Sequence, residues 1–233
     1  MVFGVILAGG IGTRMGKDIP KQYININGKP VLIYTLERFE ECDHIDKVVI
    51  VADNVWRDEI TAWIESYGIT KFLSFADPGP TRQDSVFSGV SACKPYAVDS
   101  SDIVVIHEAA RAMVSTTLIT NIIQGLDGYD ACIPVIPIKD SVIYSETGDS
   151  IDNLIDRSKL FCGQAPECFY LLPYWEINAK TDPELLSTFR ADHELCFNYR
   201  WNIHNISGEE NNFKLTTPGD IDRMISLLKT GTT

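Results

Sequence analysis

Five short apolar segments, each rich in β-branched residues, recur along the chain and alternate with segments of helical periodicity. Continuous apolar runs of this length are typical of strands that are buried on both faces of a sheet. The order strand, helix, strand predicts parallel pairing, and therefore an α/β fold with a mostly parallel sheet. The expected strands are Val2–Leu7, Lys47–Ala52, Lys71–Phe75, Ile103–His107 and Ala131–Ile136, and the expected helices between them are Leu32–Phe39, Trp56–Tyr67, Ser85–Ala92 and Leu118–Leu126.

The alternation breaks after Pro137. Ser141–Tyr144 and Ser150–Leu154 flank a polar turn, which predicts a hairpin arm over about residues 138–160 that projects from the sheet. Such a hairpin has too few apolar residues to form a core of its own, so we expect a second copy of the chain to cover it. The tail predicts a helix over Tyr170–Ala179, a strand over Asn202–Ile206 and a closing helix over Pro218–Leu228. A chain of 233 residues is expected to form one domain, 1–233.

The charge balance excludes two classes of partner. Twenty Lys and Arg residues stand against 32 Asp and Glu residues, a net charge of −12, which opposes binding to nucleic acid or to an anionic membrane.

The sequence has no apolar run of the roughly 18 residues that a membrane helix needs, and no signal-like start, so we expect a cytoplasmic protein. Six cysteines without a Cys-x-x-Cys pair indicate neither a zinc site nor a disulfide framework.

A glycine-rich segment, residues 7–17, follows the first expected strand. Its glycines let the backbone adopt positive φ and approach a ligand closely, so that several N–H groups converge on phosphate oxygens. The segment fits neither the P-loop nor the dinucleotide fingerprint, since Ile11 and Met15 stand where these motifs require glycine. The basic residues within the segment favour a triphosphate instead. The closely spaced glycines of the segment are Gly9, Gly10 and Gly12.

Cationic residues recur at the expected strand ends and loops, although the chain as a whole is acidic. An open α/β sheet places its ligand crevice at the carboxyl ends of its strands, and phosphoryl or nucleotidyl transfer requires neutralisation of developing charge there. Lys214 is expected to point either into solvent or into this site, and Ser85 is expected to cap the third helix. The cations are Arg14, Lys21, Arg82, Arg111, Arg157 and Lys214.

The segment His107–Arg111 leaves two interpretations open. A carboxylate at Glu108 beside a phosphate loop suits Mg²⁺, whereas an Arg/Glu pair at a strand end is also typical of a structural ion pair. His107 is interpreted as structural, because a phosphate nucleophile needs no general base.

Taken in order, these motifs are similar to those of one enzyme family. The sequence resembles the cytidylyltransferases of sugar-alcohol phosphates, the family of 2-C-methyl-D-erythritol 4-phosphate cytidylyltransferase and ribitol-5-phosphate cytidylyltransferase. The resemblance covers nearly the whole chain. It rests on the glycine loop with Pro20–Tyr23, on Arg82–Val86, His107–Arg111, Asp140-Ser141 and Arg157, and on Gln164–Phe169 and Lys214–Asp220.

The resemblance implies a single-domain, Rossmann-like nucleotidyltransferase that works as a homodimer on CTP and a polyol phosphate with Mg²⁺ as cofactor. It also implies roles for particular residues, with Glu108 as the metal ligand. The implied catalytic residues are Arg14, Lys21 and Lys214; the nucleotide-binding residues are Leu7, Ala8, Gly9, Gly10, Gly12, Gly79, Arg82, Ser85 and Ala109; and the residues that bind the acceptor are Arg111, Ser141 and Arg157.

The chain departs from the family pattern at a few of these positions. Glu108 stands where Asp is usual, Ala112 where Pro is usual, and Ala191 where a Thr that helps to bind the acceptor is usual. The motifs therefore leave the acceptor open between methylerythritol phosphate, ribitol phosphate and a related polyol phosphate. Two other functions also stay open: a sugar-1-phosphate nucleotidyltransferase, and a non-catalytic nucleotide-binding relative.

Overall fold

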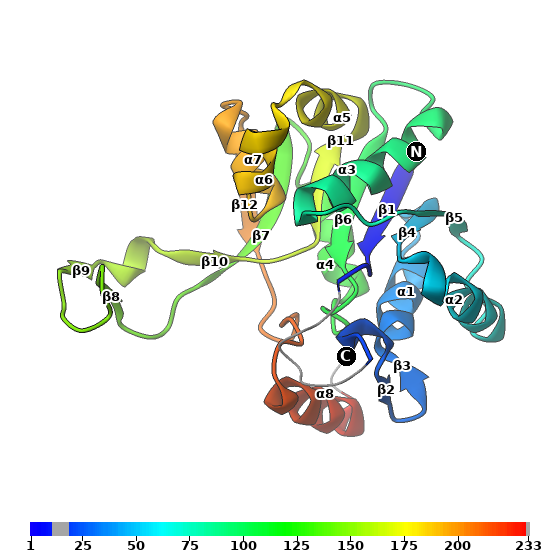
Figure 1. Ribbon diagram of the computed structural model, residues 1–233, viewed down its shortest axis with the longest axis horizontal. Helices are drawn as coiled ribbons and strands as arrows, with labels where there is room; N and C mark the ends of the chain where they lie inside the picture. Colours follow the sequence, from blue (N-terminus) through cyan, green and yellow to red (C-terminus); the bar gives the residue numbers. More distant parts are fainter. Residues whose placement is uncertain (11–18, 232–233) are drawn as a thin grey trace.

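The computed structural model describes residues 1–10 and 19–231, and their core is a twisted sheet (Figure 1). Within these residues the sheet has eight strands in the order β10-β7-β11-β6-β1-β4-β5, with β12 beside β7. Pairing is parallel between β1 and β4, β1 and β6, β4 and β5, and β7 and β12, which confirms the mostly parallel sheet. The strands are β1 (Val2–Leu7), β4 (Lys47–Val51), β5 (Phe72–Ala76), β6 (Ile103–Glu108), β7 (Ala131–Pro137), β10 (Phe161–Gly163), β11 (Glu167–Tyr170) and β12 (Ile203–Ser207).

The five expected strands and four expected helices of the first part of the chain are all present, with ends shifted by a few residues. The sequence analysis missed β10 and β11, which run antiparallel to β7, with β11 also antiparallel to β6. Each is short, and each is fixed by neighbours far away in the sequence rather than by its own periodicity. The helices of this part are α1 (Val31–Glu41), α2 (Asn54–Ser66), α3 (Arg82–Cys93) and α4 (Thr116–Gln124).

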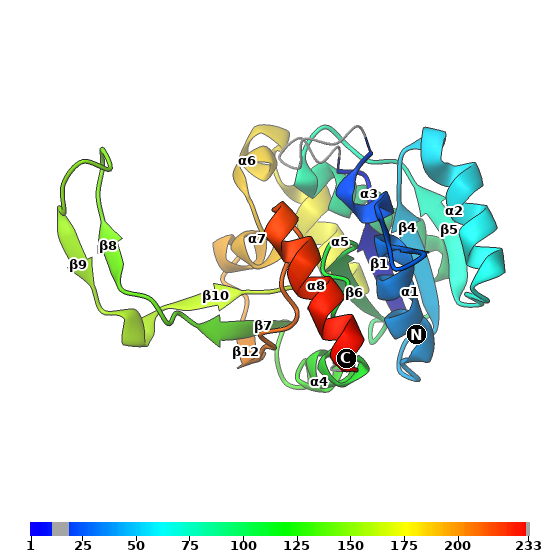
Figure 2. The ribbon, with the colours of Figure 1, turned by 90° about the horizontal axis from the view of Figure 1, so that it is seen from below.

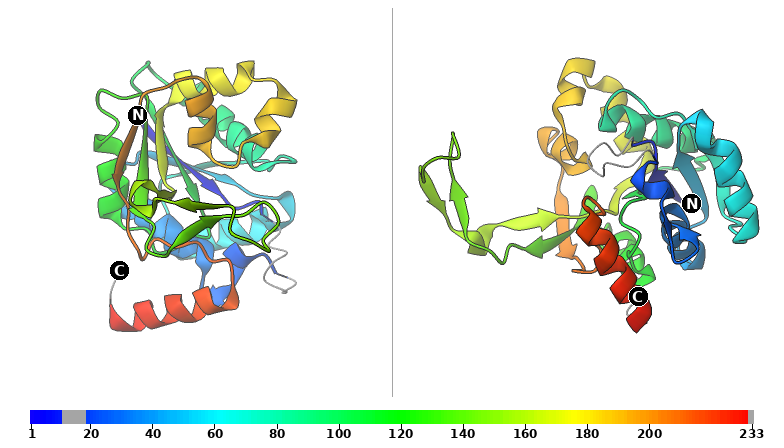
Figure 3. Two further views of the ribbon diagram at one scale, coloured as in Figure 1. Left: turned by 90° about the vertical axis from the view of Figure 1, so that its left-hand side faces the viewer. Right: turned by 60° about the horizontal axis from the view of Figure 1, so that its bottom comes forward.

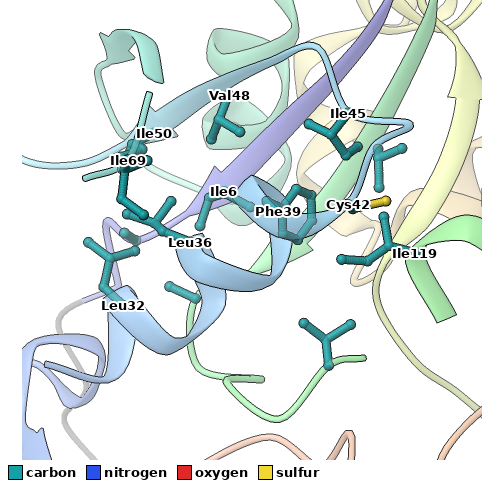
Figure 4. Packing of buried hydrophobic residues seen from close by; sticks show 14 of the residues in the cluster. Ile6, Leu32, Leu36, Phe39, Cys42, Ile45, Val48, Ile50, Ile69 and Ile119 are labelled. Carbon is teal, nitrogen blue, oxygen red and sulfur yellow. The ribbon is translucent and has the colours of Figure 1, made fainter. Parts of the chain in front are cut away.

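Two layers of helices bury the two faces of the sheet. Figure 4 shows one of these layers, in which Leu36 and Phe39 of α1 pack with Ile6 of β1 and Ile50 of β4. Side chains of α2 and α4 belong to the same cluster. On the other face, α3 packs with α5 (Leu171–Lys180), α6 (Pro183–Thr188) and α7 (Asp192–Asn198).

The chain end forms a third, smaller cluster below the sheet. Helix α8 (Pro218–Thr230) places Met224 and the preceding Leu215 against Val31 and Ala110 (Figure 1). The backbone N–H of Leu215 donates to the carbonyl of Ala110 at 2.8 Å. This contact brings residues 214–216 beside the carboxyl end of β6. Near them lie the short elements η2 (Lys21–Tyr23), β2 (Asn25–Ile26) and β3 (Lys29–Pro30).

The predicted arm projects from the body of the molecule, as Figures 2 and 3 show. Its hairpin consists of β8 (Val142–Tyr144) and β9 (Asn153–Ile155), and the 3-10 helix η4 (Arg157–Lys159) leads back to β10. The arm and the start of β10 expose large apolar side chains, which no other described part of the chain covers. They are Ile143, Tyr144, Ile151, Leu154 and Phe161.

Helix α3 approaches the sheet unusually closely at Gly89. A Cβ atom at this position would lie 2.4 Å from Val5 Cγ1 and 2.8 Å from Val51 Cγ2. Both contacts are far inside van der Waals distance, so only glycine permits this spacing between α3 and the sheet.

We therefore predict that Gly89→Ala destabilises the protein by about 1–3 kcal/mol, because overpacking outweighs the helix propensity of alanine. Gly219→Ala is the matched control, since a Cβ in this helical position meets its nearest atom, Thr217 Oγ1, at 3.8 Å. Denaturant unfolding measures both variants. Equal transition midpoints for the two variants would contradict the prediction.

Candidate functional site

A cavity of about 740 Å³ opens at the carboxyl ends of β1, β4 and β6. Strand β1 lies between β4 and β6, so the chain reverses its direction across the sheet at β1, and open α/β sheets bind ligands at such a point. The structure places nine of the expected site residues around this cavity. They are Leu7, Gly9, Gly10, Lys21, Gly79, Arg82, Ser85, Glu108 and Lys214.

The segment Pro20–Tyr23 holds the start of the glycine loop in place. The Gln22 side-chain amide donates to the carbonyls of Ala8 and Gly10 at 2.5 and 2.7 Å, and the Tyr23 hydroxyl donates to the carbonyl of Ala8 at 2.8 Å. Tyr23 also packs its ring against Trp56, with centroids 4.4 Å apart. Burial raises the pKa of the Tyr23 hydroxyl, which therefore stays a donor at neutral pH. All three hydrogen bonds end on backbone carbonyl oxygens, so they do not use the backbone N–H groups of the loop.

Glu108 lies at the centre of the cationic group. Lys214 Nζ donates to its Oε1 at 2.7 Å, and Arg111 Nε donates to its Oε2 at 3.2 Å. Arg82 Nε lies 3.8 Å from Oε1. Burial alone would raise the pKa of Glu108, but these three cations outweigh it and lower the pKa to about 2. Glu108 is therefore a carboxylate at neutral pH, and Lys214 points into the site rather than into solvent.

Gly79 and Ser85 form the wall of the cavity beside the start of α3. The Gly79 N–H donates to Ser85 Oγ at 3.0 Å. A Cβ on Gly79 would lie 2.2 Å from Cβ of Asp84, so a larger residue does not fit. The expectation that Ser85 caps α3 is wrong: Thr81 is the N-cap residue and forms a capping box with Asp84. Ser85 lies one turn further on, where its side chain reaches back to the Gly79 loop.

His107 is enclosed in the core. Its side chain is fully buried, Nε2 lies 3.1 Å from the carbonyl oxygen of Arg111, and burial lowers its pKa to about 4. A neutral imidazole bound to backbone favours the structural interpretation.

Other expected site residues are not among the described residues that line the cavity of the single chain. Ala8 and Ala109 are buried in the core, and Ala110 lines the cavity in place of Ala109. Arg111 lies behind Glu108 and also donates to the carbonyl of Asn212 at 2.9 Å. Two residues, Ser141 and Arg157, are exposed on the arm, where Arg157 donates to the carbonyl of Lys139, and two more, Gly12 and Arg14, lie outside the described residues.

The sequence analysis missed several residues of the cavity. Asp53, Thr81 and Thr216 contribute polar side chains to its wall. Their neighbours carried the signal, since each lies beside a strand end or an expected helix start. A further residue, Asp192, contacts Arg82 from behind the cavity. The family pattern includes an acidic residue near position 192, but the sequence analysis assigned it no role.

The comparison of the whole chain with known families agrees with this geometry. The family described as IspD, 2-C-methyl-D-erythritol 4-phosphate cytidylyltransferase, matches residues 2–229. The chain belongs to this family. The resemblance inferred from the motifs is thereby confirmed.

Relatives with two different names have similar sequence identity to this chain. A ribitol-5-phosphate cytidylyltransferase of Streptococcus agalactiae is 30% identical over 221 residues, which is 94% of this chain and 92% of the relative. A 2-C-methyl-D-erythritol 4-phosphate cytidylyltransferase of Clostridium acetobutylicum is 35% identical over 232 residues, 97% of this chain and 96% of the relative.

Solved structures of the family share the fold. A 4-diphosphocytidyl-2C-methyl-D-erythritol synthase from Anaerococcus prevotii superposes with a TM-score of 0.82 at 24% identity, covering 98% of this chain and 96% of that one. This likeness confirms the Rossmann-like nucleotidyltransferase sheet.

Among the helices of the described part of the chain, none combines the length and apolar character needed to cross a bilayer.

The ionisation of Glu108 predicts a distinct acid dependence for this family member. Because folding lowers the pKa of Glu108 from 4.5 to about 2, its stabilising effect is complete above about pH 4.5 and is lost as the pH falls through about 2. The difference in free energy of unfolding between the unmodified protein and Glu108→Gln should therefore shrink, by on the order of 3 kcal/mol, between pH 5 and pH 2.

Denaturant titrations over this pH range provide the measurement. Glu176→Gln is the control, since it removes a largely exposed carboxylate that pairs with Lys180 on α5. A difference for Glu108→Gln that stays constant across the pH range would contradict the ion-pair cluster.

Proposed function

We propose that this protein transfers the cytidylyl group of CTP to the phosphate of a sugar-alcohol phosphate, either 2-C-methyl-D-erythritol 4-phosphate or ribitol 5-phosphate, and releases pyrophosphate. One observation carries the proposal. In a chain of net charge −12, Lys21, Arg82 and Lys214 converge on one cavity beside a glycine loop. A site that concentrates cations against the field of the whole protein is suited to a polyphosphate ligand.

The chemistry is a direct displacement at phosphorus. A phosphate oxygen of the acceptor attacks the α-phosphorus of CTP, a new P–O–P bond forms, and the bond between the α-phosphorus and the bridging oxygen breaks to release pyrophosphate. The acceptor is already an anion at neutral pH, so no covalent enzyme intermediate is required. Lys21, Lys214 and the N–H groups of the glycine loop stabilise the charge that develops on the phosphate oxygens.

The family implies a divalent cation, and Glu108 fits a limited part in binding it. Among the described residues, no three carboxylate, histidine or cysteine side chains gather into a ligand set. Mg²⁺ characteristically binds one or two carboxylates together with substrate phosphates and water, and Glu108 supplies one such carboxylate. When bound, the cation would neutralise charge on the triphosphate.

We also propose that the acceptor site is completed by a second chain. Ser141 and Arg157 are exposed on the arm and do not border the cavity of their own chain. The apolar surface of the arm has no cover within the described residues of one chain. An isologous dimer would cover this surface and bring both residues to the cavity of the partner.

For nucleotide selectivity, we expect pyrophosphate release with CTP and Mg²⁺ and markedly less with ATP or GTP, because the chain belongs to a family of cytidylyltransferases. A coupled pyrophosphate assay with each acceptor in turn measures this. Turnover with only one acceptor identifies the substrate. CTP binding without turnover on either acceptor would instead support a non-catalytic relative, and equal rates with CTP and ATP would contradict the selectivity.

For the dimer, we expect that Lys21→Ala and Arg157→Ala are each inactive and that their mixture regains about one quarter of normal activity, since half of randomly mixed dimers contain one intact site of two. Subunit exchange is verified separately with differently tagged chains. Exchange without recovery would show that Arg157 does not act across the interface.

A further inference from the structure

Arg82 is held from behind the cavity by a carboxylate that does not border it. Arg82 Nη1 and Nη2 donate to the two carboxylate oxygens of Asp192 at 3.1 and 2.7 Å. The Tyr174 hydroxyl donates to Asp192 Oδ1 at 2.9 Å. The two ends of the pair are 110 positions apart in the sequence, at the start of α3 and the start of α7.

The pair is asymmetric in its exposure. The Asp192 side chain is completely buried, whereas 26% of the Arg82 side chain is exposed and Arg82 lines the cavity. A planar guanidinium that binds a carboxylate through both Nη atoms is fixed in position and in plane. Nε of Arg82 remains on the other edge, 3.8 Å from Oε1 of Glu108 at the centre of the cavity's cationic group.

Burial of an ion pair is costly, and for stability alone an apolar pair of similar volume serves as well or better. The pair between Arg82 and Asp192 has a second effect, because it holds a cation at the cavity wall in one orientation. A lysine at position 82 would supply the charge but not the fixed plane.

We propose that Asp192 is a positioning residue: it fixes the Arg82 guanidinium at the cavity wall so that the edge that carries Nε binds a phosphate oxygen of the nucleotide. The inference rests on the proposed function for the identity of that ligand. Asp192 itself touches neither substrate. Its effect on catalysis passes entirely through Arg82.

The kinetic test compares Asp192→Asn, Arg82→Lys and the double variant. We expect kcat/KM for CTP to fall by about a hundredfold in each, and to fall no further in the double variant, because a displaced guanidinium no longer meets its phosphate. One control keeps a structural effect apart. Asp102→Asn alters a second buried carboxylate, which pairs with the terminal ammonium of Met1 outside the cavity. This variant should lose stability but keep kcat/KM.

A second readout does not depend on turnover. In Arg82→Ala, added guanidinium ion at millimolar concentration should bind the vacated Asp192 carboxylate and raise the melting temperature, and in the presence of both substrates it should restore part of the activity. The same ion should do neither when Asp192→Asn is combined with Arg82→Ala. If Arg82→Ala does not fold, Arg82→Gly with guanidinium present during refolding replaces it.

The outcomes separate the inference from the proposed function. No pyrophosphate release by the unmodified protein would overturn the proposed function, while the guanidinium-dependent melting shift would still test the hold of Asp192 on position 82. Normal kcat/KM in Asp192→Asn, or additive losses in the double variant, would overturn the positioning role. Equal guanidinium rescue with and without Asp192→Asn would overturn it as well.

Discussion

The rest of the site depends on the ion pairs that the Glu108 carboxylate forms with the surrounding cations. Glu108 ends β6, beside the point where the glycine loop leaves β1, and it binds Lys214 and Arg111 directly while Arg82 lies 3.8 Å away. These three cations come from three different parts of the chain, so without a shared anion they would repel one another. Glu108 lets them converge beside the cavity, and Lys21 adds a further cation to the cavity wall, which favours a phosphate-rich ligand.

The supports of the site are arranged in layers behind that carboxylate. Gln22 and Tyr23 hold the loop carbonyls, α8 holds residues 214–216 against the end of β6, and Asp192 holds Arg82. Each support lies on a helix or on a turn packed against the core, so the ligand-facing groups are positioned before a ligand arrives. Preorganisation of this kind is the main source of catalysis in phosphoryl and nucleotidyl transfer.

The arm has two features that a single chain leaves unexplained. Its apolar side chains are exposed, and Arg157, one of its basic residues, does not line the cavity of its own chain. Both features have one explanation in the proposed dimer, where one interface buries the apolar surface and supplies a cation to the acceptor. In the proposed dimer the acceptor would contact groups from two chains.

The sequence by itself determined the local elements and the ligand class. Apolar runs predicted the buried strands, and apolar residues spaced three and four apart predicted the helices. The glycine loop and its cations predicted a phosphate site. Each of these patterns lies in residues that are close together in the sequence. The sequence did not reveal β10, β11 or the α3 cap at Thr81 in place of Ser85. Only the tertiary structure decided that Lys214 faces Glu108, that Ala110 rather than Ala109 borders the cavity, and that Asp192 reaches Arg82. The two ion pairs join residues 106 and 110 positions apart in the sequence. The packing of helices on the sheet sets their geometry, and no local sequence pattern encodes that packing.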